Sequence, residues 1–533
     1  MTERSSDASA AETPVGESAV GAPAGARVRW IILAALALGA MMDAWDGTAV
    51  AVANPSIAGE LNTTLTELQW VTNGYMLATA VFLITAGKIG DRFGHKRVFL
   101  VGVAGFMASS VLVGFAGHIS LLIAFRVLQG LFGALLLPNS LAILTATFPP
   151  DKVKSAFGIF MGTFAVAGAS GPFVGGLLVQ YLDWRWVFFV NVALGACAFA
   201  VAAKLVPGTA PSGPARPFDL PGVLLLTIAL GGLVLGVIQV PEHGWTGAYP
   251  LSCLSVGVAG AILFVVRETR IKLPFFPLSL FRSAAITAST VATLVAGGLM
   301  FSCWFFLALY LQEVRGLSPL LAGLELLPVN VVFLAASPVG GMLNQRFGPR
   351  LPILSGLVLV AVALFGLSQL SADSSYNAIW PFLVPLSMGV SFLAPTASQV
   401  IVGRSPAELT GVASGLGQTA LIGGSVLSIA VLGTLVLFRT GSTFSANLAG
   451  AGVPSQVADQ LSGSAASVAQ GSITVPPDVP QHFAPAIVQA AHTSFMDGFG
   501  LAFLVAGILV LLVVPLGFLV RSEDPPARPE AAA

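Results

Sequence analysis

The sequence GKIGDRFGHKR, at residues 87–97, joins two long apolar runs at 66–88 and 98–117. A second copy of its pattern, G-x-x-x-x-R-F-G, occupies residues 341–348 and also follows a long apolar run. Four fixed residues that recur in equivalent places are not expected by chance, so the pattern indicates two homologous halves. Its glycines allow a tight reversal between two helices, and its basic residues suit the inner face of a membrane.

The composition of the 533-residue chain is that of a membrane protein. Apolar residues make up 56% of the chain and charged residues 9%, and the mean hydropathy is +0.89. A soluble domain carries about 25% charged residues, so this composition excludes a water-facing surface. The 24 basic and 24 acidic residues cancel, which removes any bulk electrostatic case for nucleic acid. Cys197, Cys253 and Cys303 lie far apart in apolar stretches, and we interpret them as core residues, not as a disulfide framework.

Long apolar runs predict the number of membrane spans. About 20 apolar residues cross a bilayer core as one helix. Fourteen runs of about that length occur, at 28–54, 66–88, 98–117, 119–146, 155–181, 186–206, 219–240, 249–266, 285–311, 319–343, 351–370, 379–402, 411–438 and 499–520. A β-barrel would show short alternating strands instead. The predicted fold class is therefore an all-α membrane protein with fourteen spans.

The positions of Lys and Arg test this count, because inner loops carry the excess of basic residues. With the N-terminus inside, 20 of the 24 basic residues fall in inner segments, 3 in outer segments and 1, Arg126, within a span. A missed or additional span would move every later loop to the other face and spoil this distribution. We therefore predict fourteen spans with both termini in the cytoplasm.

The repeat also predicts the domain organisation. Two six-span halves would place the two copies six spans apart, whereas they lie eight apart, so an additional pair of spans lies between the halves. We predict a disordered tail at 1–27, a six-helix bundle at 28–206, two inserted helices at 207–284, a second six-helix bundle at 285–520 and a tail at 521–533. An outer loop at 439–498 is expected, with a short helix near 455–468; a lid and a plain connector both fit it. Parallel repeats of this kind are typical of secondary transporters.

Several motifs resemble those of the major facilitator superfamily. Residues 87–97 are similar to its motif A, RVLQG at 126–130 to its motif B, and GPFVGG at 171–176 to its motif C, which is associated with antiporters. DGT at 46–48, with Pro55 nine residues after Asp46, resembles the first-span motif of the fourteen-span drug/proton antiporters. The resemblance runs from about residue 30 to 520, and it implies two six-helix bundles plus two inserted helices.

The resemblance implies proton-coupled export of amphipathic, cationic or neutral organic compounds, such as drugs or antibiotics, across the bacterial plasma membrane. The expected partners are a small-molecule substrate, protons and the lipid bilayer; the energy source is the proton gradient, with no cofactor, and the chain is expected to act as a monomer. A flippase for lipids or their precursors and a metabolite facilitator or importer on the same fold are alternatives. An enzyme is not expected, because the five His lie in loops or at span ends without metal-ligand spacing and no phosphate-binding GxxxxGK[ST] occurs.

Four ionisable residues inside spans are candidates for proton coupling or substrate binding: Asp43, Asp46, Arg126 and Glu325. A charge at a helix centre costs about 2.5–3.5 kcal/mol, so such residues face a cavity or a partner. Asp43 and Asp46 share one helix face, and either is a candidate partner for Arg126. A carboxylate that exchanges a proton for a cation is one interpretation, and a structural ion pair is the other. Asp46 is favoured because it occupies the motif position, while Glu325 adds a third negative charge or reaches the outer surface.

Two glycine-containing motifs are candidates for conformational roles. The resemblance implies a latch, with contacts that form in only one state, at Gly87, Gly90, Asp91, Arg92, Gly94, Lys96 and Arg97; an anchor that only sets topology is the alternative. Glycine and proline also make the fifth span thin and kinked, at Gly171, Pro172, Gly175 and Gly176. A hinge and a tight, leak-limiting interface both fit this second motif. No metal site is expected.

Overall fold

The computed structural model describes residues 25–208, 219–271, 278–406, 409–471, 473, 475 and 479–520. Within these ranges the chain forms helices joined by turns, and no strand occurs. Thirteen helices are long and apolar enough to cross a membrane, and a bent pair, Leu65–Leu83 with Thr85–Phe93, makes a fourteenth. The all-α, fourteen-span class is therefore confirmed. The tails predicted at 1–27 and 521–533 lie outside the described residues, apart from 25–27.

The first half of the chain forms six spans, of which the fourth is broken into two helices. The helices are α1 (Ala26–Leu61), α2 (Leu65–Phe93), α3 (His95–Gly114), α4 (Ile119–Gly133), α5 (Leu136–Thr147), α6 (Pro150–Tyr181) and α7 (Trp186–Leu205). α1 packs against α6 and α7, and α3 packs against α4 and α7. α1 is consequently buried along most of its length and carries its polar residues into the protein.

Two further spans follow, α8 (Leu220–Ile238) and α10 (Ala248–Arg270), joined through the short α9 (Val240–His243). They pack closely because two glycines face each other: a Cβ at Gly232 would lie 2.7 Å from the Cα of Gly257. α8 also contacts both α2 and α15, so the inserted pair lies against both halves. A 3-10 turn, η1 (Leu278–Arg282), leads into the second half.

The second half begins with α11 (Ala284–Leu309), which continues as a π-helical turn, η2 (Tyr310–Val314). Its remaining long helices are α12 (Pro319–Phe347), α13 (Arg350–Leu367), α14 (Tyr376–Gly403), α15 (Thr410–Gly450) and α18 (Ala484–Gly517). α11 packs against α14 and α15, and α18 covers α13 and α15. The two halves meet where α1 contacts α11, α2 contacts α15 and α6 contacts α12.

The repeated sequence pattern encodes the same helix ending in both halves. Gly94 follows α2 with φ 90°, and Gly348 follows α12 with φ 75°. The N–H of Gly94 donates to the carbonyl of Gly90 at 2.8 Å, and the N–H of Gly348 donates to that of Asn344 at 2.9 Å. Positive φ is costly for any residue with a Cβ, so the last glycine of the pattern is required by the backbone.

The segment 439–498 is largely helical, which differs from the expected outer loop. α15 continues to Gly450, and α18 begins at Ala484. Between them lie α16 (Ser455–Leu461), η4 (Ser462–Ser464), α17 (Ala465–Val468) and η5 (Gln481–Phe483), in agreement with a short helix near 455–468. Phe444, Leu448 and Ile487 are among the residues buried in a separate small core here. The segment contains many alanines. Alanine is a strong helix former, so this composition is compatible with helices as well as with a loop.

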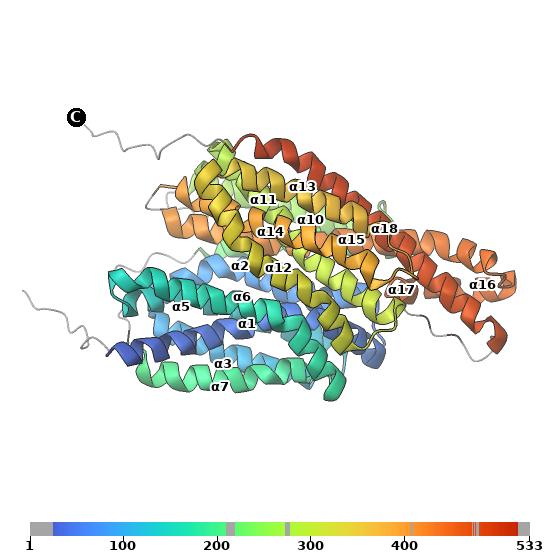
Figure 1. The fold of residues 1–533 in the computed structure, drawn as a ribbon, viewed down its shortest axis with the longest axis horizontal. Helices are drawn as coiled ribbons and strands as arrows, with labels where there is room; N and C mark the ends of the chain where they lie inside the picture. The colour runs from blue at the N-terminus through green and yellow to red at the C-terminus, as the bar shows by residue number, and fades with distance from the viewer. Residues whose placement is uncertain are drawn as a thin grey trace, which may run out of the picture.

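We call residues 439–471 and 479–493 the outer cap. Figure 1 shows that this segment, around α16, projects beyond the other helices at one end of the bundle. The start of α1 and the end of α18 both lie toward the opposite end, on different sides of the bundle. We call the end with the cap the outer face and the end with residues 87–97 the inner face.

Candidate functional site

Asp46 and Arg126 form a buried ion pair inside the first bundle. Arg126 Nη1, on α4, donates to Asp46 Oδ2, on α1, and both residues are only 1% exposed. The second carboxylate oxygen, Oδ1, accepts from Gln129 Nε2 at 2.9 Å and from Asn191 Nδ2 at 3.4 Å. A buried charge is tolerated only when it is paired and hydrogen-bonded in this way. The structure therefore places Asp46 in a fully bonded position, away from lipid and water.

The Arg126 guanidinium has additional partners that fix its position. Its Nε donates to the carbonyl of Val71 at 3.0 Å, and its Nη1 also donates to Gln129 Oε1 at 2.6 Å. Its Cζ lies 4.2 Å from the ring centre of Tyr75 and 5.6 Å from that of Phe188. Cation–π contacts of this kind are strongest where water is excluded. The guanidinium is thus held at one place, between α1, α2 and α7.

Asp43 lies one turn before Asp46 on α1 and has a different environment. Tyr75 Oη donates to Asp43 Oδ1, and Asp43 is partly exposed whereas Asp46 is buried. A Cβ at Gly133 would lie 3.0 Å from Asp43 Oδ1, so the glycine leaves room for the carboxylate. Arg126 already pairs with Asp46. With both carboxylates ionised, the cluster therefore carries one uncompensated negative charge, which belongs to Asp43.

Sequence reasoning did not identify all members of this cluster. Ser110, on α3, accepts from Gln129 Nε2 at 2.8 Å and from Asn191 Nδ2 at 3.5 Å. Tyr75 joins the two aspartates, because its hydroxyl bonds Asp43 while its ring covers the arginine. One signal was available for Tyr75: it is one of five Tyr in the chain and lies inside an apolar span. A serine in such a span gives no comparable signal.

Glu325 lies apart from this cluster, in the second half. Its Oε2 accepts from Arg315 Nη1 at 3.0 Å, and Tyr376 Oη donates to its main-chain carbonyl at 3.1 Å. The charge of Glu325 is compensated locally, so it does not add to that of Asp43. Because the sequence assigns Arg315 to an outer loop and Glu325 to a span, their pairing was not predicted.

The turn at 87–97 is bound within the first half. His95 Nε2 lies 3.3 Å from Asp91 Oδ1, and His95 Nδ1 lies 2.9 Å from Asn139 Oδ1 on α5. Lys96 Nζ donates to the carbonyl of Ala203 on α7 at 2.9 Å. These contacts attach the turn to α5 and α7. A state-dependent contact of this turn with the second half stays a prediction.

Two glycines of α6 bring this helix against α1. A Cβ at Gly175 would lie 2.9 Å from the Cβ of Ala49 and 3.0 Å from its carbonyl oxygen. At Gly171, the corresponding atom would lie 2.9 Å from the Cβ of Thr48. All three distances are shorter than ordinary van der Waals contact, so any larger residue would separate α6 from the helix that carries the aspartates.

The next glycine of α6 packs against the second half. A Cβ at Gly176 would lie 2.9 Å from the main-chain carbon of Pro319, and one at Gly323 of α12 would lie 2.9 Å from that of Pro172. Farther toward the inner face of α6, a Cβ at Gly162 would meet no described atom within 4 Å. α6 and α12 are thus in close main-chain contact near the outer face, whereas Gly162 of α6 faces open space.

Replacing Gly176 with Ala is expected to weaken this packing. The added methyl group meets main-chain atoms of α12 that cannot rotate away, and overpacking of this kind costs about 1–3 kcal/mol. We expect a lower midpoint of thermal unfolding in detergent and slower transport. Gly162→Ala is the matched control, because its methyl group has free space on the same helix. Equal unfolding midpoints for the two variants would contradict the packing described above.

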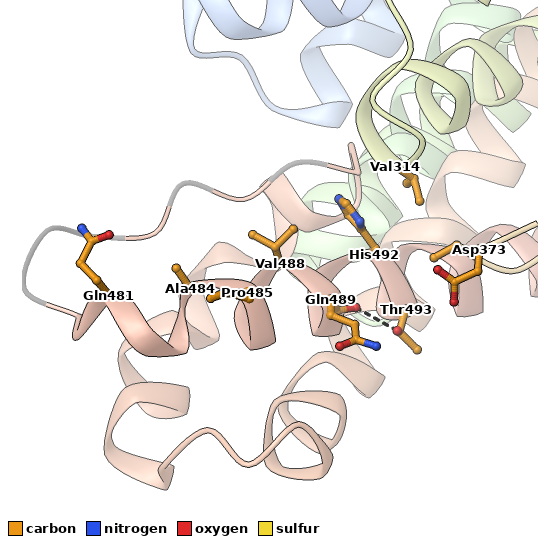
Figure 2. A pocket seen from close by; sticks show the side chains of 10 residues that line it. Val314, Asp373, Gln481, Ala484, Pro485, Val488, Gln489, His492 and Thr493 are labelled. Carbon is orange, nitrogen blue, oxygen red and sulfur yellow. Dashed lines mark hydrogen bonds between the residues drawn. The ribbon is translucent and has the colours of Figure 1, made fainter.

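An open cleft occurs elsewhere, on the outer face of the second half. It has a volume of about 690 Å³ and lies between the start of α18, the end of η2 and the connection from α13 to α14 (Figure 2). Asp373, His492 and Gln489 supply polar groups. The side chains belong to the second half and the cap, so this cleft is separate from the cluster on α1 and α4.

Comparison with known sequences shows the family. The sequence model described as the Major Facilitator Superfamily matches residues 36–429. The chain belongs to the major facilitator superfamily. The resemblance inferred from residues 87–97, 126–130 and 171–176 is therefore confirmed, and the chain is an integral membrane transporter.

Its relatives within the superfamily are resistance and export proteins. The tetracenomycin C resistance and export protein of Streptomyces glaucescens is 40% identical over 499 residues, covering 94% of this chain and 93% of that protein. The multidrug efflux pump LfrA of Mycolicibacterium smegmatis is 32% identical over 483 residues, covering 90% and 94%. The multidrug resistance protein Stp of Mycobacterium tuberculosis is 34% identical over 506 residues, covering 92% of each chain. These relatives are transporters, not enzymes.

Solved structures agree with the fold. A peptide transporter, POT, crystallised with sulfate, has a TM-score of 0.61 at 17% identity, covering 93% of this chain and 97% of the other. A bacterial homologue of the human lysosomal transporter Spinster has a TM-score of 0.61 at 18% identity, covering 93% and 98%. At such identities the likeness establishes the major facilitator fold and nothing about substrate.

Proposed function

We propose that this transporter exports amphipathic organic compounds, cationic or neutral, in exchange for protons across the bacterial plasma membrane. The observation that carries the proposal is the cluster of Asp43, Asp46 and Arg126, with two carboxylates and one guanidinium inside the first bundle. The resistance and export relatives support the outward direction and the class of substrate. The chain acts as a monomer, and the proton gradient supplies the energy without a cofactor.

Asp43 is the carboxylate that we assign to the exchange. Asp46 accepts hydrogen bonds from Arg126, Gln129 and Asn191, so its negative charge is already neutralised. Asp43 has one neutral donor, Tyr75, and part of its surface is open. An uncompensated carboxylate within a membrane is costly, so it favours either a proton or a nearby cation. It does not accommodate both, and for a cationic substrate this exclusion couples the two fluxes.

Both termini are proposed to lie in the cytoplasm. The distribution of basic residues, with 20 in inner segments and 3 in outer ones, supports this orientation. The start of α1 and the end of α18 lie at the same face of the bundle, as an even number of spans requires (Figure 1). In this orientation, α1 presents Asp43 before Asp46 to a substrate that enters from the cytoplasm.

Inverted membrane vesicles test the proposed function. The vesicle interior, which corresponds to the cell exterior, is made acidic, and ethidium is added outside as a permanently cationic probe. We expect ethidium to accumulate while a luminal pH indicator reports loss of protons, and vesicles without the transporter serve as the control. Tetracenomycin C, which is named in the description of a relative, provides a second probe. Ethidium accumulation that leaves the luminal pH unchanged and survives collapse of the pH gradient would contradict proton exchange.

A further inference from the structure

We propose that the outer face is held closed by uncharged amide side chains, each hydrogen-bonded to the main chain of the opposite half. This proposal concerns closure of the outer face and goes beyond proton exchange, on which it does not depend. Three glutamines contribute the main bonds: Gln69 in the first half, Gln312 in the second half and Gln470 in the outer cap.

Gln69 joins α2 to α15. Its Nε2 donates to the carbonyl of Ile429 at 3.0 Å, and the residue is 3% exposed. The position four residues after Ile429 on α15 is Gly433, where a Cβ would lie 2.7 Å from Gln69 Cδ. The glycine therefore forms a notch that accepts the amide. The notch and the bond together fix the separation of the two helices at the outer end of α2.

Gln312 joins the second half to α1. Its Nε2, in the π-helical turn η2, donates to the carbonyl of Val52 at 3.0 Å. The turn matters because α11 ends at Leu309 and the wider π-helical geometry changes the direction of the side chains that follow. Val52 lies six residues after Asp46 on α1, so this bond holds the helix that carries Asp43 and Asp46.

Gln470 joins the outer cap to the first half. Its Nε2 donates to the carbonyl of Thr63 at 2.7 Å, and it is 4% exposed. Thr63 precedes the capping box of Thr64 and Glu67 that begins α2, so the accepting carbonyl is held in place. The cap has its own buried core and is therefore a folded strap across the outer end of both halves.

Two further amide side chains, between α6 and α12, are also hydrogen-bonded to the main chain of the opposite half. Asn330 Nδ2 donates to the carbonyl of Ala169 at 2.8 Å, and Gln180 Oε1 accepts from the main-chain N–H of Leu320 at 3.3 Å. These bonds flank the glycines that pack α6 against α12. All five bonds cross between the halves, and in each the side-chain partner is a neutral amide.

Three ion pairs among the described residues, in contrast, each join two residues of the same half. Arg126 pairs with Asp46 and Arg185 with Glu60 in the first half, and Arg315 pairs with Glu325 in the second. The hydrogen bonds to Glu60 raise the pKa of the Arg185 guanidinium above its ordinary value, so this pair stays charged. A hydrogen bond from a neutral amide side chain contributes little free energy to the closed state, and the amide does not titrate. A set of such bonds closes the outer face while leaving it able to open in every cycle.

Spin-label distances test the proposal directly. Labels are placed at Tyr181→Cys, on the outer end of α6, and Ser375→Cys, before α14; both positions are exposed. The native cysteines Cys197, Cys253 and Cys303 are replaced by serine or alanine. Double electron–electron resonance on the full chain then measures the separation of the two halves at the outer face. Each of Gln69→Ala, Gln312→Ala and Gln470→Ala should raise the ratio of open to closed populations about two- to tenfold.

Asn344→Ala is the matched control, because Asn344 Nδ2 donates to Gln399 Oε1 at 2.8 Å within the second half. It should leave the distance distribution unchanged. All variants are compared as monodisperse protein. Unchanged distributions in all three glutamine variants would overturn the proposal.

The variant Gln470→Glu distinguishes loss of the hydrogen bond from its replacement by a group that titrates. In Gln470→Glu, the ionised carboxylate faces the carbonyl of Thr63 and repels it, whereas the protonated form can donate to it. The open population of this variant should rise with increasing pH more steeply than that of Gln470→Ala. Identical pH dependence in the two variants would show that Gln470 does not hold the cap in the closed state.

Discussion

Replacing Arg126 with Ala should abolish export and destabilise the first bundle. The substitution leaves the carboxylate of Asp46 buried without its counter-charge, and breaking one side of a buried pair costs about 3–5 kcal/mol. It also removes the bond to the Val71 carbonyl and the contact with the Tyr75 ring. We expect a large fall in the midpoint of thermal unfolding in detergent and ethidium efflux from cells at the background rate.

Two variants separate charge from geometry at this position. Arg126→Lys keeps the charge, but an ammonium group does not reproduce the guanidinium fork that bonds Asp46, Val71 and Gln129 together; we expect partial stability and little export. Combining Asp46→Asn with Arg126→Gln removes both charges and should restore stability without export. An Arg126→Ala protein with wild-type unfolding and efflux would contradict the structural account of the pair.

Asp43→Asn should abolish proton-driven export while leaving the fold intact. The amide oxygen of asparagine still accepts from Tyr75, so the packing of α1 against α2 is kept, but the side chain no longer exchanges a proton. We expect the initial rate of uphill ethidium uptake into acid-loaded inverted vesicles to fall at least about 100-fold, a barrier change of about 2.7 kcal/mol. The unfolding midpoint should stay close to that of the wild type.

The matched control for this variant is Asp373→Asn, which removes an exposed carboxylate from the outer cleft shown in Figure 2 and should leave accumulation unchanged. Asp46→Asn provides the contrast, because it leaves Arg126 unpaired and should lower stability as well as transport. If Asp43→Asn accumulates ethidium as the wild type does, while Asp46→Asn is stable and inactive, the assignments of the two aspartates must be exchanged.

Much of the fold follows from local sequence properties. Long apolar runs predict the spans, and the two glycine-ended copies of one pattern predict two halves with a pair of helices between them. The pattern is informative because Gly94 and Gly348 must adopt positive φ at the same kind of helix ending. The outer cap was predicted less well, because Ala and Ser occur in loops and helices alike and its small core forms only when α15, α16 and α18 come together.

The candidate site was predictable only in part, because partners depend on tertiary packing. Asp46 and Arg126 are recognisable as charges within apolar spans that need a counter-charge. Nothing in the local sequence identifies which carboxylate Arg126 contacts. Nor does it indicate that Tyr75 contacts both Asp43 and Arg126. Likewise, Gln69 and Gln312 resemble any polar residue near a span end, and their role emerges only when α15 and α1 supply the accepting carbonyls.

The pH dependence of ethidium affinity reports whether a proton and the cation compete for Asp43. Binding of ethidium to purified protein in detergent is measured across a range of pH by fluorescence. If a proton and the cation compete for Asp43, affinity in the wild type rises about tenfold per pH unit on the acid side and levels off once the carboxylate is ionised. Asp43→Asn should bind ethidium more weakly and equally at every pH. An Asp43→Asn protein that keeps the wild-type pH dependence would show that the exchanged proton resides elsewhere.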